Sequence, residues 1–157
     1  MSTARVLTAI QNSSVAHAIS KSNHMVAASL QIVHVIGFIL LLASIVMISL
    51  RLLGLAFAQQ PISKVGRDAT RLIWIGLALT VASGTLMFVS SPRLYYYNPA
   101  FELKMLLLIA AVLIQVLLLR RVAASDSPTP ALVRTTVALS LASWFGVGLA
   151  GRIIGFI

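Results

Sequence analysis

The sequence contains no cysteine and only three acidic residues, and both shortages narrow the possible chemistry. Without cysteine there is no disulfide, no thiolate nucleophile and no Cys-ligated zinc or iron–sulfur site. The acidic residues are Asp68, Glu102 and Asp126. Two of them fall in loops expected on one side of a membrane, and the third falls on the other side. A pair of carboxylates acting together as acid and base within one chain is therefore not expected.

Charge of either sign is also scarce. Only 10% of the 157 residues are charged and 59% are hydrophobic, with a mean hydropathy of +1.00. Soluble domains average about 25% charged residues, so this chain has too little polar surface to coat a water-soluble globule. The net charge of +9 comes from Lys and Arg residues mostly at the ends of apolar runs, where they can meet lipid phosphates. The sequence predicts an integral membrane protein and no binding to nucleic acid.

The apolar residues form four runs that carry no permanently charged side chain, at 25–50, 72–91, 105–119 and 135–151. About 20 helical residues cross the hydrocarbon core, and the short third run is extended by Lys104 and Arg120 snorkelling from its ends. Proline interrupts the short connections, as at Pro61 and Pro92. We therefore predict an all-α fold, an integral membrane four-helix bundle that forms a single domain over residues 1–157.

Residues 1–24 precede the first apolar run and are polar, so they are not expected to be a cleavable signal peptide. Apolar residues recur there loosely at helical spacing, which favours a short N-terminal helix lying at the membrane interface. A simple polar tail is the alternative. Residues 25–157 then supply the four transmembrane helices.

Basic residues near the helix ends predict the orientation. The first and third loops hold seven of them, namely Arg51, Lys64, Arg67, Arg71, Arg120, Arg121 and Arg134. The N-terminal segment, second loop and C-terminus hold five, namely Arg5, Lys21, Arg93, Lys104 and Arg152. This bias places the first and third loops in the cytoplasm and both termini outside it.

His34 is the first candidate for a functional residue. It lies about 13 Å into the first helix at 1.5 Å per residue, and an ionisable group at that depth is expected to face the bundle interior with a partner. Gly37, Leu41 and Ser44 follow on the same helix face. His34 could hold a ligand or carry a proton. It could equally be a neutral imidazole, hydrogen-bonded to a hydroxyl or carbonyl, that holds helices together.

Five further candidates share the predicted outer half of the bundle with His34, namely Met87, Glu102, Lys104, Trp144 and Arg152. Met87 has a similar predicted depth, so a His–Met metal pair is conceivable. Glu102 and Lys104 are two residues apart and do not pair within one helix, but either could reach His34 or Arg152. Arg152 could bind a lipid phosphate or another anion. In the inner half, the amide of Gln115 is expected to find a partner within the bundle.

Taken as a set, these positions resemble an uncharacterised family of bacterial inner-membrane proteins, a domain of unknown function, over almost the whole chain. The positions that carry the resemblance are His34 with Gly37, LRLLG at 50–54, Ser83-Gly84 with Phe88, NPAFELK at 98–104, and Gly151-Arg152 with Gly155-Phe156. Ser49 departs from the pattern because the family often has an acid there, and Ser83 stands where threonine is common.

The resemblance implies a four-helix protein of the bacterial inner membrane. It also implies a distant similarity to CopD-type copper-resistance membrane proteins. Since the family has no settled activity, it implies a fold and not a function.

Three functions fit the sequence. The first is a non-enzymatic binding or accessory protein with a site around His34, whose partners would be membrane lipids, another membrane protein or a second copy of the chain. The second is a b-type haem or copper-handling protein. Because His17, His24 and His34 all lie in the N-terminal portion, bis-histidine ligation would need a dimer or a fold-back of His24. The third is a small transporter or channel subunit. No nucleophile–base–acid set is visible, so an enzyme is not expected.

Overall fold

The computed structural model describes residues 3–21, 24–120 and 129–156, and over these ranges the chain is helical with no strand. The predicted residues Arg121 and Asp126 lie outside the described residues, as do the side chains of Lys21 and His24. The helices are α1 (Thr3–Gln11), α2 (Ser14–Lys21), α3 (His24–Leu52), α4 (Ile62–Ser90), α5 (Pro92–Tyr96), α6 (Pro99–Ile114), the π-helical turn η1 (Gln115–Leu119) and α8 (Pro130–Ile153). Four spans are long and apolar enough to cross a membrane, which confirms the predicted all-α membrane bundle.

The helices begin earlier than the apolar runs. Helix α4 starts at Ile62, ten residues before the predicted run, and its first turns carry Lys64 and Arg67. Charged residues are compatible with a helix that projects beyond the hydrocarbon, so the apolar run marks the crossing and not the helix end. Helices α6 and α8 likewise start at Pro99 and Pro130, because proline is favoured in the first helical turn.

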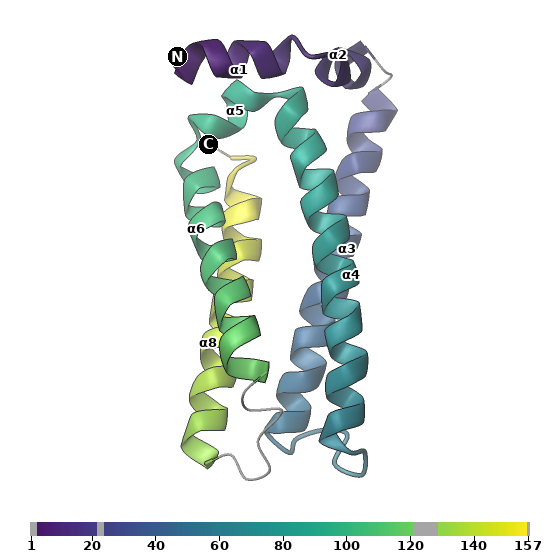
Figure 1. Cartoon of the computed structure of the whole chain (residues 1–157), viewed down its shortest axis with the longest axis vertical. Coiled ribbons are helices and arrows are strands. Elements are labelled where there is room, and N and C mark those ends of the chain that lie inside the picture. The colour runs from purple at the N-terminus through teal and green to yellow at the C-terminus, as the bar shows by residue number, and fades with distance from the viewer. Residues whose placement is uncertain (1–2, 22–23, 121–128, 157) are drawn as a thin grey trace.

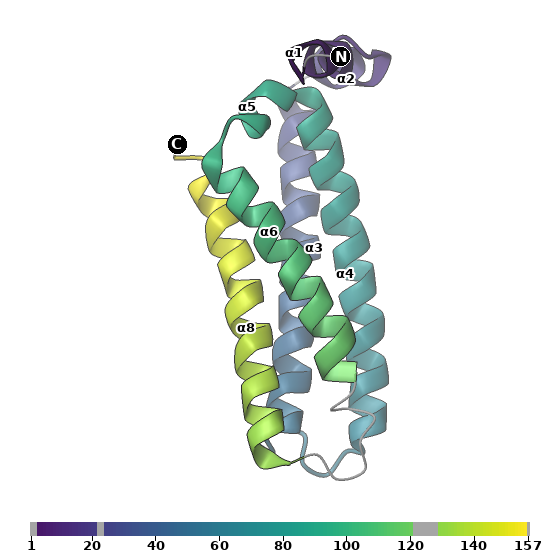
Figure 2. The same cartoon turned by 60° about the vertical axis from the view of Figure 1, so that its left-hand side comes forward.

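The four long helices form two antiparallel pairs (Figures 1 and 2). Helix α3 packs along α4, α6 packs along α8, and α3 also contacts α8. This arrangement leaves α4 and α6 facing each other on the remaining side, and both helices line a pocket there. The two pairs therefore make a bundle whose α4–α6 side is the less tightly packed one.

The N-terminal segment is helical, as predicted, but it forms two helices rather than one. Helices α1 and α2 lie across the end of the bundle (Figure 1). Leu7 and Ala16 are buried, and the Arg93 guanidinium donates to Thr8 Oγ1 over 2.8 Å. These contacts fix α1 and α2 on the bundle end and give them the position expected of interfacial helices.

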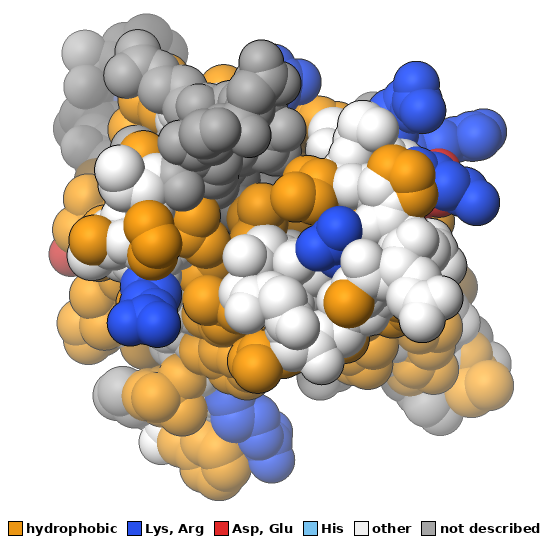
Figure 3. Space-filling view, turned by 90° about the horizontal axis from the view of Figure 1, so that it is seen from below, with side chains coloured by type: hydrophobic (Ala, Val, Ile, Leu, Met, Phe, Trp, Pro, Cys, Tyr) orange, Lys and Arg blue, Asp and Glu red, His pale blue; other side chains and the backbone are white. Residues whose placement is uncertain are grey.

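Basic side chains gather at the opposite end of the bundle. Figure 3 views that end and shows Lys and Arg at several points around the rim. The described basic residues that the sequence predicts for the cytoplasm belong to this end, namely Arg51, Lys64, Arg67, Arg71, Arg120 and Arg134. The orientation of the bundle in a membrane stays a prediction.

Two glycines allow α3 and α4 to cross closely. A Cβ added to Gly76 would lie 2.6 Å from Gly37 O and 2.7 Å from Leu41 N. No side chain fits there, because both neighbours are backbone atoms of a packed helix. Small residues at such positions let membrane helices approach and gain van der Waals contact. The crossing fixes the register of α3 against α4, and therefore which side chains of the two helices lie next to each other further along the pair.

The core continues from this crossing towards α8. It contains Leu41, Ile45, Ile73, Ala111, Trp144 and Val147. The outward faces are also apolar, with Ile39, Leu106 and Leu149 at least half exposed. In water such faces would be an aggregation liability, whereas lipid covers them without cost.

Replacing Gly76 with alanine should destabilise the bundle by about 1–3 kcal/mol, because overpacking forces the helices apart. Gly66→Ala is the matched control on the same helix, since its Cβ would lie 3.4 Å from the movable end of Ile48. We expect the control to be neutral or stabilising, because alanine favours helix by about 1 kcal/mol over glycine. Thermal unfolding in a mild detergent measures both, and equal stability of the two variants would contradict the close crossing.

Candidate functional site

His34 faces the bundle interior, as predicted. Its imidazole Nδ1 lies 3.2 Å from Ser83 Oγ on α4. Gly84 lies beside the ring, and a Cβ there would approach the imidazole to 3.0 Å. The glycine therefore leaves the space that the imidazole fills. Ser83 and Gly84 of α4 thus border the imidazole on two sides.

Lys104 of α6 contacts the imidazole on a third side. Its Nζ lies 3.3 Å from His34 Nε2. Gly151 on α8 borders the lysine stem, and a Cβ added to this glycine would lie 3.4 Å from Nζ. The contact joins one helix pair to the other, and it realises the expectation that Lys104 could reach His34.

Hydrogen-bond geometry defines where the imidazole proton lies. An ammonium can only donate, so His34 Nε2 accepts from Lys104 and carries no proton. Ser83 Oγ donates its one proton to Leu79 O over 2.6 Å, so it accepts from the imidazole. Both contacts assign the proton to Nδ1. The geometry thus describes a neutral imidazole that donates to Ser83 and accepts from Lys104.

The start of α6 sets the position of Lys104. Asn98 is buried and caps the helix, with its Oδ1 accepting from Ala100 N over 3.0 Å. Its amide Nδ2 donates to Ile154 O over 3.3 Å. One side chain therefore fixes the beginning of α6 to the end of α8. Lys104 follows about 8 Å further along the α6 axis at 1.5 Å per residue.

An aromatic cluster lies between α4 and the start of α6. The ring centroids of Phe88 and Phe101 are 5.6 Å apart and stacked, and Tyr95 lies 5.6 Å from Phe101. Burial raises the pKa of the Tyr95 hydroxyl above its ordinary value of 10.0. Tyr95 therefore stays neutral near physiological pH and brings no negative charge to this end of the bundle.

No hydrogen bond or ion pair joins the other predicted residues to His34 in the described part of the chain. Met87 lies one turn beyond Ser83 on α4, and its carbonyl accepts from Ser90. Glu102 is exposed. Arg152 is also exposed, and its Cζ lies 4.8 Å from the centre of the Phe156 ring. These residues share the same half of the bundle without forming one cluster.

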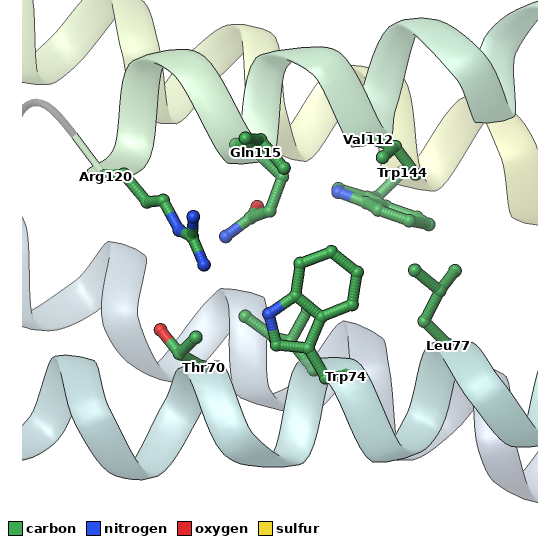
Figure 4. A pocket seen from close by; sticks show the side chains of 9 residues that line it. Thr70, Trp74, Leu77, Val112, Gln115, Arg120 and Trp144 are labelled. Carbon is green, nitrogen blue, oxygen red and sulfur yellow. The ribbon is translucent and has the colours of Figure 1, made fainter.

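Trp144 makes no hydrogen bond to the other predicted residues within the described part of the chain, and its part in a site stays a prediction. It precedes Arg152 by eight residues, which is about 12 Å along the helix. Its side chain is buried in the core beside Leu41. Together with Trp74 and Gln115 it lines the pocket between α4 and α6, nearer the basic end (Figure 4). Gln115 Oε1 there accepts from Ser140 over 3.3 Å, which confirms the expected partner for this amide.

The sequence interpretation missed Trp74 and Thr70, which line the pocket between α4 and α6. Trp74 lies inside the second apolar run and so resembles an ordinary lipid-facing residue. Its spacing of four residues from Thr70 puts both on one face of α4, which is the signal that could have identified them.

A metal centre would have few ligands here. In residues 3–21, 24–120 and 129–156, no group of three or more His, Asp and Glu side chains gathers closely enough to hold a metal ion. His34 Nε2 is the atom that could bind one, and Lys104 is in contact with it.

The imidazole of His34 should be the Nδ1–H tautomer. Nitrogen NMR of histidine-labelled protein in micelles distinguishes a protonated from an unprotonated ring nitrogen, and His34→Gln identifies the resonance. We expect Lys104→Met to shift the Nε2 signal and Ser83→Ala to shift Nδ1. A doubly protonated ring at pH 7, or a proton on Nε2, would contradict the assignment.

Comparison with known proteins gives one match, a family model described as a family of unknown function, DUF6644, over residues 9–157. Neither curated proteins nor solved structures give a match, and the similarity to CopD-type proteins stays a prediction. The family match covers nearly the whole length and includes His34, Ser83 and Lys104. This chain therefore belongs to the family of unknown function DUF6644.

Proposed function

We propose that this chain is a non-enzymatic binding protein that holds a lipid-like molecule by its anionic headgroup at Lys104. The observation that carries the proposal is that the half-buried Lys104 Nζ has the His34 imidazole, and no carboxylate, as its hydrogen-bond partner among the described residues. The ligand would have a carboxylate or phosphate at one end and an apolar chain at the other. We call His34, Ser83 and Lys104 together the outer site.

The charge balance at the outer site favours an external anion. Lys104 lies in the second turn of α6 and is half-buried, and a charged side chain inside a membrane bundle is normally paired. The imidazole satisfies one N–H of Lys104 but neutralises no charge. No carboxylate pairs with Lys104 within the described part of the chain, and Glu102, the acid nearest in sequence, is exposed. An anion beside Nζ would remove this imbalance.

The surroundings suit an amphipathic molecule. Leu103 and Leu106 are exposed together on a face of α6 next to that of Lys104, so an acyl chain could follow the helix surface. Arg152 is exposed at the same end of the bundle, where it could meet a second oxygen of a headgroup. The polar groups thus lie where a lipid headgroup would bind, and the apolar helix surface lies where its acyl chain would follow.

The Ser83–His34 pair does not support hydrolytic chemistry. An activated serine gives its proton to the imidazole, whereas Ser83 gives its proton to the helix carbonyl of Leu79. Ser83 is also only 3% exposed, which leaves no approach for a substrate carbonyl. The contact therefore supports a structural role for the hydroxyl and a non-enzymatic function.

Haem or copper binding at His34 is the second candidate function. The Nδ1–H bond to Ser83 favours it, because a metal-binding histidine usually donates its other nitrogen to a fixed acceptor. Lys104 would have to leave Nε2 first, and a further ligand would have to come from elsewhere.

We place the protein in a bacterial inner membrane with both termini outside the cytoplasm. The support is the excess of basic residues in the first and third loops. A reporter enzyme that is active only in the periplasm should be active when it is fused after residue 157. Activity of a cytoplasmic reporter at the same position would show that the C-terminus lies in the cytoplasm and would contradict this orientation.

Replacing Lys104 with methionine should weaken the specific binding of acidic lipids at the outer site. Loss of a charge-assisted hydrogen bond is worth about 1.5–3 kcal/mol, which is roughly a tenfold to hundredfold weaker affinity. Native mass spectrometry from a neutral detergent measures the adducts formed with palmitate and, separately, with phosphatidylglycerol. Lys64→Met removes an exposed lysine at the other end and is the control.

The same preparations separate the candidate functions. Binding that is equal in Lys104→Met and Lys64→Met would contradict the proposal, provided thermal unfolding shows both variants folded. A Soret band or stoichiometric copper that disappears in His34→Ala would favour the second candidate.

A further inference from the structure

The pocket lined by α4 and α6 lies near the basic end of the bundle, in the half away from the outer site. It opens between α4 and η1, with Trp144 of α8 at its inner wall (Figure 4). The polar groups around it belong to Thr70, Trp74, Gln115, Arg120 and Trp144. We call these five residues the inner pocket. None of the outer-site residues lines it.

The deepest polar group of the inner pocket has no partner. Trp144 is 1% exposed, and its indole Nε1 makes no hydrogen bond to any described residue. Figure 4 shows this nitrogen on the side of the ring that faces Gln115. A buried donor without an acceptor costs about 1–3 kcal/mol. The orphan N–H is therefore an independent sign that a ligand group completes the pocket.

The remaining groups are mainly donors as well. Gln115 uses its Oε1 to accept from Ser140, which leaves the amide NH₂ for the pocket. Figure 4 shows this NH₂ and the Arg120 guanidinium directed into the same space, with the Trp74 indole nitrogen on the same side. Donors repel one another unless an acceptor lies between them. No carboxylate is among the lining residues, so none of them brings a negative charge to these donors, and an anion from outside would supply both charge and acceptor.

The local backbone puts these donors together. Gln115 begins the π-helical turn η1, where Gln115 N approaches both Ala111 O and Val112 O. Such turns are rare and occur frequently at functional sites. Arg120 follows directly after the turn.

We propose that the inner pocket binds an anionic phosphate group. The guanidinium of Arg120 is exposed and suits two phosphate oxygens at the mouth. The enclosed space is about 20 Å³, enough for about one water-sized group. One phosphate oxygen would therefore enter towards Gln115 and Trp144 while the remainder stays outside. The phosphate could belong to an anionic lipid headgroup or be free in solution. This inference does not depend on the outer site.

Intrinsic fluorescence tests the inner pocket directly, because the chain's two tryptophans, Trp74 and Trp144, both line it. The full chain in maltoside detergent is titrated with phosphatidylglycerol, with phosphatidylcholine and with inorganic phosphate. Trp74→Phe and Trp144→Phe leave one reporter each. Arg120→Gln removes the charge at the mouth, and Arg134→Gln removes an exposed arginine of α8 at the same end and is the matched control.

We expect a saturable change of emission in the wild type and in Arg134→Gln, with an affinity at least about tenfold weaker in Arg120→Gln. The Trp74→Phe variant should still show a change of emission, at weaker affinity because one donor is lost, since Trp144 Nε1 gains an acceptor. A response to phosphatidylglycerol alone identifies the lipid headgroup, and an equal response to inorganic phosphate identifies a free anion. The proposal is overturned if no anion changes the emission, or if Arg120→Gln and Arg134→Gln weaken it equally. Lys104→Met should leave this response unchanged.

Discussion

The contact between Lys104 Nζ and His34 Nε2 is the interaction on which the outer half of the bundle depends. It connects α6 to α3 and so joins two helix pairs that otherwise meet mainly through α3 and α8. The imidazole can accept from the lysine when its other nitrogen carries the proton, and Ser83 Oγ lies where it can accept that proton's hydrogen bond. Three helices thereby share one line of hydrogen bonds that contains a single positive charge. That unbalanced charge is what suggests an anionic ligand.

The lipid environment explains why such a bundle can exist. With both the core and the outer faces apolar, burial of hydrophobic surface contributes little to helix association in a membrane. Close packing at Gly37 and Gly76 replaces it and fixes the register of α3 on α4. That register brings Ser83 and Gly84 to the imidazole of His34. The same glycines that hold the pair together thus build the outer site.

The sequence predicted the depth of each residue and the face of its helix, but not which helices are neighbours. Depth and face were enough to place His34 in the interior and to offer Glu102 and Lys104 as alternative partners, because an ionisable group in lipid needs one. They did not decide between the two. They could not reveal the surroundings of Trp144, because its burial beside Leu41 and Gln115 depends on how α8 packs on α3 and α6. The proton on His34 also depends on tertiary contacts that no local pattern reveals. The apolar runs do not mark the helix ends, because charged residues such as Lys64 extend α4 beyond the apolar run.

The pairing of Lys104 with an anion is tested most directly by a distance measurement in a bilayer. Magic-angle-spinning NMR measures dipolar coupling from ¹⁵N-labelled lysine to ¹³C-carboxyl palmitate or to the ³¹P of phosphatidylglycerol, with Lys104→Met identifying the signal. An anion at the outer site predicts a coupling that places Nζ within about 4 Å of a headgroup oxygen and that Lys104→Met removes. Lipid bound to the protein with no such coupling to either headgroup would contradict the account.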